Sequence, residues 1–186
     1  MKKIAVLTGA GISTSAGIPD FRGPEGVWTK HPEQQSVYDI DAFLHDQQAR
    51  EYSWRWQKES PVWNAQPGEA HKALARLEQA GMLTLLATQN FDALHEKAGN
   101  TDKVIVNLHG TIGTSHCMTC HAKYDTADIM DRLDEQPDPH CRRKLPYRGN
   151  MPCNGLIKTD VVYFGEMLPE GAMETSMKRA CEADEF

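Results

Sequence analysis

The chain has 186 residues, of which 40% are hydrophobic and 25% charged, and its formal net charge is −6 at pH 7. This length and composition allow one hydrophobic core with a small additional module and are typical of a soluble globular protein. The negative charge argues against general nucleic-acid binding, although a local basic patch at residues 142–144 remains compatible with it. No apolar run is long enough for a membrane span, and we predict neither a nucleic-acid nor a membrane partner. Four of the five cysteines cluster in a chain without a recognisable secretory signal, which favours metal over disulfides, so we predict a cytoplasmic protein.

The first predicted element is a short buried strand that turns directly into a helix. Residues 4–7 are apolar, and Gly9 and Gly11 follow them. These glycines let the backbone turn tightly and approach a pyrophosphate, which the N–H groups of a helix N-terminus favour. The usual dinucleotide fingerprint would have a third glycine at position 14, which is Thr14, and no second strand ending in an acid follows about 20 residues later. We predict a nucleotide site here, with a plain strand-to-helix turn as the alternative.

The same N-terminus has a basic start and a short apolar run, as a signal peptide does. The run passes into a glycine turn rather than a cleavage site, so we interpret it as a strand. Residues 30–66 follow, rich in aromatic residues and glutamine, with Pro61 and Pro67 interrupting the helical spacing of the apolar positions. This pattern predicts short helices and loops, and packing is the simplest role for the aromatic rings.

Alternating helices and strands come next. Residues 69–80 have an amphipathic pattern that ends at Gly81, which predicts a helix. The apolar run 82–88 predicts a buried strand, residues 92–98 a short helix, and residues 104–108 another strand. The three predicted strands with helical crossovers are typical of an open parallel sheet.

Polar residues or glycines follow each predicted strand. Ligands of open parallel sheets bind outside the carboxyl ends of the strands. Residues 9–13, residues 89–92 and His109 are therefore expected around one crevice. A later apolar run at 161–164 leads toward a helix predicted from about residue 170.

Residues 113–158 break this pattern because they are polar, rich in proline and bear cysteines. We predict an α/β fold with a Rossmann-like parallel sheet formed by residues 1–112 and 159–186. A helical insertion at about 30–66 belongs to this nucleotide-binding domain. Residues 113–158 form a small zinc-binding module.

Four of the five cysteines gather in this module. They are Cys117, Cys120, Cys141 and Cys153, separated by two, 20 and 11 residues. A C-x-x-C pair directs two thiolates to one side of a tight turn, which suits a structural tetrahedral zinc, and we predict one such ion. Because the second pair lacks this spacing, His116, His121 and His140 are alternative ligands, and a redox C-x-x-C is an alternative function.

Together these motifs resemble the sirtuins, NAD-dependent protein lysine deacylases, over nearly the whole chain. The matching blocks are residues 9–13, 17–23, 88–92 and 108–110, the four cysteines, and residues 161–166. Position 91 is usually a branched aliphatic residue in this family and here is Phe91, and Ala93 stands where glycine is common.

The resemblance implies that NAD and acylated lysine react to give nicotinamide, O-acyl-ADP-ribose and free lysine. The implied cofactor contacts are Gly9, Ala10, Gly11, Ile12, Ser13, Asp20, Phe21, Arg22, Trp28, Gln89, Asn90, Asp92 and His109. The implied catalytic residues are His109, as general base for the ribose hydroxyls, and Asn90, which holds the ribose with Gln89. Asp92 would hold the carboxamide, Phe21 would shield the reactive carbon from water, and Arg22 would meet phosphate. A structural role for His109, and an Asp20–Arg22 ion pair that fixes the loop, are the alternatives.

The resemblance also implies a binding site for acylated protein or peptide substrates. Val161, Phe164, Gly165 and Glu166 match the strand with which the peptide pairs through main-chain groups, and an ordinary turn is the alternative. Tyr52 and Arg55 resemble the pair that binds succinyl or malonyl carboxylates in some sirtuins, with a surface or packing role as the alternative.

The sirtuin pattern continues with a further strand and a substrate-clamping loop, and this sequence stops before both. We therefore expect a fragment or a truncated gene product, an exposed apolar sheet edge, and an uncertain activity for the 186-residue polypeptide itself. An NAD(P)-dependent oxidoreductase and a non-catalytic zinc- and NAD-binding module are the alternative functions. The sequence does not indicate the oligomeric state, the substrate proteins or the preferred acyl group.

Overall fold

The computed structural model describes residues 2–186, which divide into two compact units. The sheet unit contains residues 2–35, 61–110 and 166–186, and the cysteine unit contains residues 36–60 and 111–165. The predicted division assigned all of the helical insertion to the NAD-binding domain. The structure instead groups residues 36–60 with the cysteine-bearing segment.

The sheet unit is built on three parallel strands in the order β1-β2-β3. Their bounds are Ile4–Thr8 for β1, Leu83–Thr88 for β2 and Ile105–Asn107 for β3. Four of the six residues of β2 are fully buried and apolar, which is expected for a parallel strand covered on both faces. The predicted α/β fold with a parallel sheet is confirmed.

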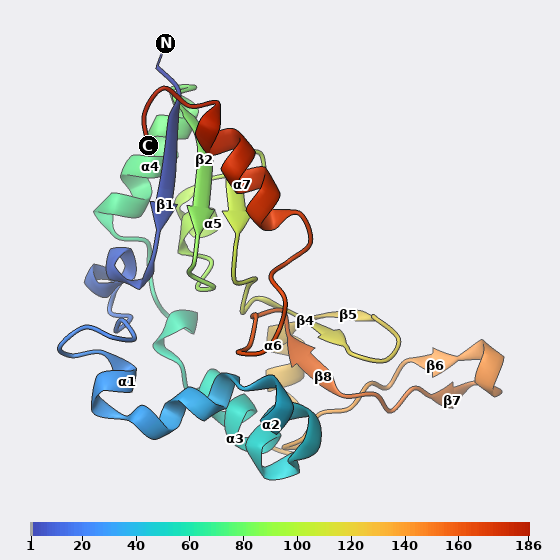
Figure 1. Cartoon of the computed structure of the whole chain (residues 1–186). Helices are drawn as coiled ribbons and strands as arrows, with labels where there is room; N and C mark the ends of the chain where they lie inside the picture. The colour runs from blue at the N-terminus through green and yellow to red at the C-terminus, as the bar shows by residue number, and fades with distance from the viewer. Residues whose placement is uncertain (1) are drawn as a thin grey trace. The chain divides into compact units, whose positions relative to one another are not determined.

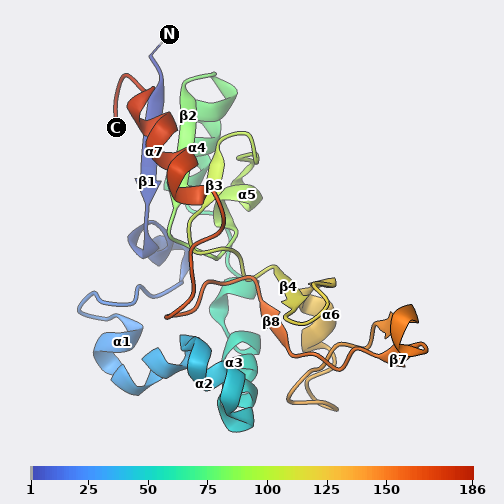
Figure 2. The ribbon, with the colours of Figure 1, turned by 45° about the vertical axis from the view of Figure 1, so that its right-hand side comes forward.

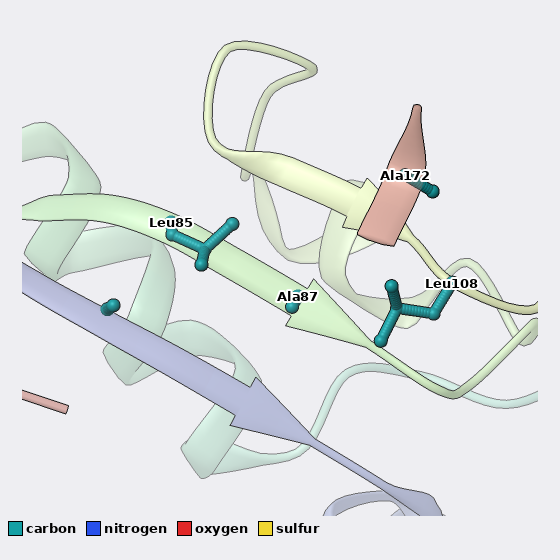
Figure 3. Close-up of a cluster of buried hydrophobic side chains, with 5 residues drawn as sticks. Leu85, Ala87, Leu108 and Ala172 are labelled. Atoms are coloured by element: carbon teal, nitrogen blue, oxygen red, sulfur yellow. The ribbon is translucent and has the colours of Figure 1, made fainter. Parts of the chain in front are cut away.

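Helices cover both faces of this sheet (Figures 1 and 2). On one face, α7 (Ala172–Cys181) packs through Ala172 against Leu85, Ala87 and Leu108, as Figure 3 shows. On the other face, Leu74 and Leu77 of α4 (Glu69–Gln79) pack against Leu83, Leu86, Val104 and Ile105. Leu85 and Leu86 are neighbours in β2 but belong to apolar clusters on opposite faces of the sheet. This is expected because successive side chains of a strand point to opposite faces.

Glycines end two helices of the sheet unit as the sequence predicts. Helix α4 (Glu69–Gln79) is followed by Gly81 at φ +70°, and α5 (Leu94–Ala98) is followed by Gly99 at φ +107°. Both glycines adopt the left-handed conformation that commonly terminates helices. The remaining short helices of this unit are the 3₁₀ helix η1 (Ala10–Ala16), α1 (Val27–Lys30) and the 3₁₀ helix η3 (Pro61–Trp63).

The cysteine unit combines helices with a small antiparallel sheet. The 3₁₀ helix η2 (Pro32–Tyr38) leads into α2 (Ile40–His45) and α3 (Gln47–Lys58). The sheet has the order β5-β4-β8, with bounds Thr114–Cys117 for β4, Lys123–Asp125 for β5 and Ile157–Thr159 for β8. Helix α6 (Thr126–Met130) follows β5, and β6 (Lys144–Leu145), η4 (Pro146–Arg148) and β7 (Met151–Pro152) form the extended hairpin of Figure 1.

A buried ion pair ties α3 to the cysteine-bearing segment of the same unit. The guanidinium of Arg50 donates from Nε and Nη2 to the two carboxylate oxygens of Asp138, at 2.9 and 2.8 Å. Its Nη1 donates to the carbonyl of Phe43 at 3.0 Å. Helices α2 and α3 are thereby fixed to a residue 88 positions further along the chain.

The apolar run Val161–Phe164 forms no regular strand; an isolated bridge joins Phe164 to Asp39. The ring of Tyr163 packs edge-on against Tyr38 and Phe43, at centroid distances of 5.2 and 5.5 Å. Val161 and Tyr163 are therefore apolar because they are buried in the core of the cysteine unit, whereas Phe164 is 48% exposed.

The outer edge of β1 is only partly covered. The amide of Ala5 donates to the carbonyl of Glu185 at 2.9 Å, and the amide of Asp184 donates to the carbonyl of Lys3 at 2.8 Å. Further along the strand, Leu7 is 48% exposed. Within residues 2–186, no helix has the length and apolar character needed to cross a membrane.

Candidate functional site

The carboxyl ends of the three parallel strands lie in register. Thr8 is the partner of Thr88, and Thr88 is the partner of Asn107. The amide of Gln89 donates to the carbonyl of Thr8 at 2.9 Å. The amide of Leu108 donates to the carbonyl of Thr88 at 2.8 Å. The structure therefore brings together the residues that follow each strand, as the predicted crevice requires.

The turn after β1 leads into a 3₁₀ helix rather than an α-helix. Gly9 has an extended conformation and precedes η1, whose C-terminal neighbour Gly17 lies at φ +85°. The side-chain amide of Asn90 donates from Nδ2 to the carbonyl of Gly9 at 3.2 Å. This bond ties the loop after β2 to the glycine turn, so both loops are held at one edge of the sheet.

Three buried polar side chains meet behind this turn. The hydroxyl of Ser13 donates to Oδ2 of Asp92 at 2.6 Å, and Nδ2 of Asn90 lies 3.2 Å from the Ser13 oxygen. The amide of Leu94 donates to Oδ1 of Asp92 at 3.0 Å. Charge-assisted bonds of this kind stabilise an ionised carboxylate. Asp92 is thus an oriented anionic acceptor at the start of α5.

His109 has a defined orientation at the end of β3. Its Nδ1 lies 2.9 Å from the carbonyl oxygen of Gln89. A carbonyl can only accept, so Nδ1 carries the proton, and in the neutral ring Nε2 has a free lone pair. The ring is partly exposed. This arrangement leaves Nε2 as the basic nitrogen of the ring, which suits a general base.

The loop of residues 20–28 is closed by aromatic contacts. The ring of Phe21 lies 4.6 Å from that of Trp28 and 6.2 Å from that of Phe91, centroid to centroid. The Arg22 guanidinium lies over the Trp28 ring at 5.3 Å, a cation–π arrangement. Asp20 accepts the amide of Gly23 at 2.8 Å. Within residues 2–186, no ion pair joins Asp20 to Arg22, so this alternative does not describe the loop.

Gly26 lets this loop fold back on itself. A Cβ at this position would lie 2.7 Å from the amide nitrogen of Arg22 and the carbonyl carbon of Phe21, both of which are backbone atoms. Backbone cannot move aside as a flexible side chain can. The position therefore requires glycine for the loop to keep this shape.

Sequence reasoning missed two buried histidines beneath the site. His71 and His95 are 0% and 1% exposed, and their ring centroids lie 4.9 Å apart. Burial lowers the pKa of His71, against the opposing charge of Asp92. Burial, and next the neighbouring His71, lowers the pKa of His95 to about 4. The one available signal was the position of His71 in the first turn of a predicted helix, three residues after Gly68.

The four predicted cysteines converge in the cysteine unit. All four Sγ atoms lie within 4.8 Å of one another. The Sγ atoms of Cys117 and Cys153 are 3.7 Å apart, and those of Cys120 and Cys141 are 3.6 Å apart. Tetrahedral zinc with Zn–S bonds near 2.3 Å places its sulfurs about 3.8 Å apart. The cluster could therefore hold one zinc ion.

The surroundings of the cluster also suit thiolate ligands. The amides of Thr119 and Cys120 each lie 3.4 Å from Sγ of Cys117, and the Tyr124 hydroxyl lies 2.9 Å from Sγ of Cys141. A Cβ on Gly155 would lie 2.7 Å from the Cys117 sulfur, so glycine is needed beside it.

The alternative histidine ligands lie elsewhere. His116 Nδ1 pairs with Asp160 at 2.6 Å, and His140 Nδ1 bonds the carbonyl of Asn154 at 2.8 Å. Burial raises the pKa of Asp160, but its bonds with His116 and Thr114 and nearby charges outweigh this, so the net pKa is lowered. Among residues 2–186, the close group of potential metal ligands contains the four cysteines and no histidine.

The predicted substrate residues are divided between the units. Val161 is buried, whereas Phe164 and Gly165 are exposed, and all three belong to the cysteine unit. Glu166 begins the C-terminal part of the sheet unit. Tyr52 and Arg55 lie on the exposed surface of α3, three residues apart, and no ion pair or hydrogen bond of the Arg55 side chain occurs among residues 2–186. Their predicted roles stay proposals.

The fold and the site define a class: an α/β protein with a polar site at the ends of parallel strands and a four-cysteine cluster suited to zinc. The sequence profile of the Sir2 family matches residues 9–186. The chain belongs to the Sir2 family.

Curated relatives share most of this chain. NAD-dependent protein deacetylase 2 of Streptomyces coelicolor is 35% identical over 182 residues, which cover 96% of this chain and 72% of the relative. The NAD-dependent protein deacetylase of Thermotoga maritima is 40% identical over 173 residues, which cover 92% of this chain and 64% of the relative. The chain therefore spans about two thirds of the length of these proteins.

Solved structures agree with this assignment. A Sir2 variant with a deacetylated peptide and 3′-O-acetyl ADP-ribose superposes with a TM-score of 0.83 and 37% sequence identity, covering 97% of this chain and 68% of that one. Further similar structures contain a propionylated peptide, or a peptide with NAD+.

Proposed function

We propose that this protein takes part in NAD-dependent removal of acyl groups from protein lysines, with deacetylation as the default activity. The observation that carries the proposal is the set of groups at the strand ends: a glycine turn, an oriented Asp92 carboxylate and a His109 ring with its basic Nε2 free. The names of the relatives support the same reaction. When bound, NAD supplies the ADP-ribosyl group that accepts the acyl group as nicotinamide leaves.

His109 is proposed as the general base. Its Nδ1–H donates to the carbonyl of Gln89, so the ring is held with Nε2 ready to accept a proton from a ribose hydroxyl. The proton taken up by Nε2 leaves the ring cationic, and the Gln89 carbonyl stabilises the imidazolium through the same bond.

The neighbouring residues are proposed to bind and orient the cofactor. Asn90 and Gln89 follow β2 and would contact the ribose, while the Asp92 carboxylate would accept from the carboxamide N–H₂ group. The glycine turn, residues 9–13, would meet the phosphates, and Arg22 would add a positive charge there. Phe21, held against Trp28 and Phe91, would exclude water from the reacting carbon.

The proposed substrate is an acyl-lysine in an extended peptide. Phe164 already pairs through its backbone on one side, since its amide donates to the carbonyl of Tyr38 at 2.7 Å and its carbonyl accepts from Ile40 at 3.1 Å. An extended segment held in this way could add a peptide strand through main-chain bonds. Relatives of this chain bind peptides in solved structures.

The four-cysteine cluster is proposed to bind one structural zinc. A site with four protein ligands has no open position for substrate, so its role would be to fold the cysteine unit rather than to catalyse. We also propose a cytoplasmic location, because four of the five cysteines cluster as potential metal ligands and a reducing compartment favours metal binding over disulfides.

The proposal is tested by measuring nicotinamide release from NAD with and without an acetyl-lysine peptide. We expect release only when peptide is present, and a loss of about a hundredfold or more in His109→Gln. His45→Gln changes an exposed histidine of α2 and serves as the matched control. Reduced nicotinamide, detected by its absorbance, would instead identify an oxidoreductase. Tight NAD binding without nicotinamide release would favour a non-catalytic binding module.

A further inference from the structure

The hydroxyl of Tyr163 lies in a buried polar cluster of the cysteine unit. The side-chain amide of Gln57 donates from Nε2 to this hydroxyl at 3.0 Å, and the hydroxyl of Ser53 lies 3.0 Å from it. The Gln57 amide also donates to the Ser53 hydroxyl at 3.2 Å. Each of the three residues is at most 1% exposed. The cluster therefore joins the segment after β8 to helix α3 through bonds that are shielded from water.

The face of the Tyr163 ring is held by a buried lysine. The ammonium of Lys158, a β8 residue that is 2% exposed, lies 4.2 Å from the centroid of this ring. The same ammonium donates to the carbonyls of Thr159 and Val161 at 3.0 and 2.7 Å. A buried cation is stable only while such partners stay in place. Lys158 thus fixes the backbone just before Tyr163, and the hydroxyl cluster fixes Tyr163 itself.

The next residue, Phe164, belongs to the segment proposed to add a peptide strand. Its isolated bridge to Asp39 is formed by the two main-chain bonds to residues 38 and 40. Pairing through the main chain depends on the exact placement of N–H and C=O groups, because hydrogen bonds weaken quickly with distance and misalignment. A side chain that fixes this backbone can therefore contribute to peptide binding without touching the peptide.

We propose that Tyr163 is a positioning residue for the acylated peptide. Its hydroxyl, anchored to Ser53 and Gln57, holds the backbone of residues 163–165 in the conformation to which a peptide strand adds. This inference rests on the proposed function. It extends that function because α3 then acts on peptide affinity from within the core, through a hydroxyl that no ligand contacts.

A second buried pair of hydroxyls in the same unit provides a matched control. The hydroxyls of Ser115 and Thr126 lie 2.7 Å apart, and both residues are 0% exposed. Tyr163→Phe and Thr126→Val each remove one hydroxyl from a buried pair and keep a side chain of nearly the same shape. Both variants should destabilise the cysteine unit to a similar extent. Only Tyr163→Phe removes a bond that reaches residues 163–165.

Hydrogen exchange tests the positioning without any ligand. The amide of Phe164 donates to the carbonyl of Tyr38 and is expected to exchange through local opening of its segment. This amide should exchange about tenfold faster in Tyr163→Phe than in the unmodified chain, and within about twofold of it in Thr126→Val. Equal acceleration in the two variants would show that the Tyr163 hydroxyl only supports the fold of the unit. An unchanged rate in Tyr163→Phe would show that the hydroxyl does not hold the segment.

Binding of a fluorescent acetyl-lysine peptide, followed by anisotropy, tests the consequence. Tyr163→Phe should weaken binding about fivefold, and Thr126→Val by less than about twofold. Ser53→Ala, which removes one partner of the hydroxyl, should weaken binding in the unmodified chain. In the Tyr163→Phe background it should add little, because both changes break the same connection.

Peptides N-methylated at one of the amides beside the acetyl-lysine test whether the effect acts through main-chain pairing. The methyl group that weakens binding to the unmodified chain should weaken binding to Tyr163→Phe by a smaller factor, because that pairing is already impaired. Equal factors in the two proteins would contradict a role of Tyr163 in positioning the backbone.

The outcomes separate this inference from the proposed function. If the unmodified chain bound the peptide and Tyr163→Phe bound it equally well, or if Tyr163→Phe and Thr126→Val lost the same affinity, only the role of Tyr163 would be overturned. If the unmodified chain did not bind the peptide, the proposed peptide site would fail, and the role of Tyr163 in peptide binding with it. The hydrogen-exchange comparison would still decide whether the hydroxyl fixes the segment.

Discussion

The central strands of the two units bury different kinds of side chain. In the sheet unit, β2 alone buries Leu83, Leu85, Leu86 and Ala87, and helices on both faces complete two apolar clusters. In the cysteine unit, the central strand β4 buries Ser115 and Cys117 instead. Apolar burial stabilises by about 25 cal/mol per Å², so a strand with such residues gains little from it. The cysteine unit nevertheless buries large apolar side chains elsewhere, among them Phe43, Trp54 and Tyr163. The buried ion pair, and the proposed zinc, would therefore add to apolar burial in this unit rather than replace it.

Removal of the proposed zinc should give the largest difference in stability between the two units. Structural zinc contributes on the order of 10 kcal/mol of folding free energy in small modules. We expect one zinc per chain by elemental analysis. After chelation, or in Cys117→Ala, amides of β4 and β8 should lose their protection from hydrogen exchange while those of β2 keep theirs.

Cys181→Ser is the control, because this exposed cysteine lies on α7, outside the cluster. A metal-free protein with fully protected β4 amides would show that packing alone folds the cysteine unit and would remove the proposed contrast.

The next largest effect is expected at the ion pair between α3 and Asp138. The side chains of Arg50 and Asp138 are only 10% and 9% exposed, and the bond to Asp138 raises the pKa of Arg50. Asp138→Asn should leave a buried guanidinium without its counter-charge, which costs about 3–5 kcal/mol. Urea unfolding of the cysteine unit, followed by Trp54 fluorescence, measures this loss.

Helix α3 provides its own comparison. Lys58 pairs with Asp134 at 2.7 Å, but these side chains are 37% and 86% exposed. Asp134→Asn should therefore cost less than about 1 kcal/mol, because water screens such a pair. Similar losses for the two Asp→Asn variants would mean that burial of the Arg50 pair is not what stabilises this unit.

In the sheet unit we expect an acid-dependent loss of stability. The pKa of His95 is about 4 in the folded protein, against about 6.5 for an unperturbed histidine. Between these values the unfolded chain binds more protons, so stability falls as the pH falls from about 6.5 to 4, by about 3 kcal/mol in total. The lowered pKa of His71 acts in the same direction.

Hydrogen exchange of β2 amides across this pH range measures the effect within the sheet unit. His95→Phe should be less stable at pH 7 but should show a shallower pH dependence, because one of the two buried rings no longer titrates. An unchanged slope would assign the acid sensitivity to other groups.

The sequence predicted those features whose causes are local. The ends of α4 and α5 could be read from Gly81 and Gly99, because a left-handed residue terminates a helix wherever it occurs. The three strand ends were predicted from short apolar runs followed by polar residues. The C-x-x-C pair indicated the cysteine cluster for the same reason, since two of its ligands lie on one turn.

Features that depend on distant partners were missed. The run Val161–Phe164 has the composition of a strand, but its Tyr163 packs against Tyr38 and Phe43, which lie more than 100 residues earlier in the sequence. The neighbouring rings of His71 and His95 come from two different helices, α4 and α5. No local pattern reports such contacts, because they exist only after the helices pack.

The smallest predicted effect contrasts two arginines of α3. Arg50 is fully engaged by Asp138, whereas Arg55 lies exposed, without an ion-pair partner among residues 2–186, and near Tyr52 in sequence. If Arg55 binds the carboxylate of a succinyl-lysine, Arg55→Met should lower activity on a succinyl peptide about tenfold, or 1.4 kcal/mol. Activity on an acetyl peptide should change little, because an acetyl group offers no charge to a guanidinium. Unlike Asp138→Asn, Arg55→Met should leave the urea midpoint unchanged. If Arg55→Met changed the activity on both peptides equally, Arg55 would have no role in binding the acyl group. The protein would then show no preference for acidic acyl groups.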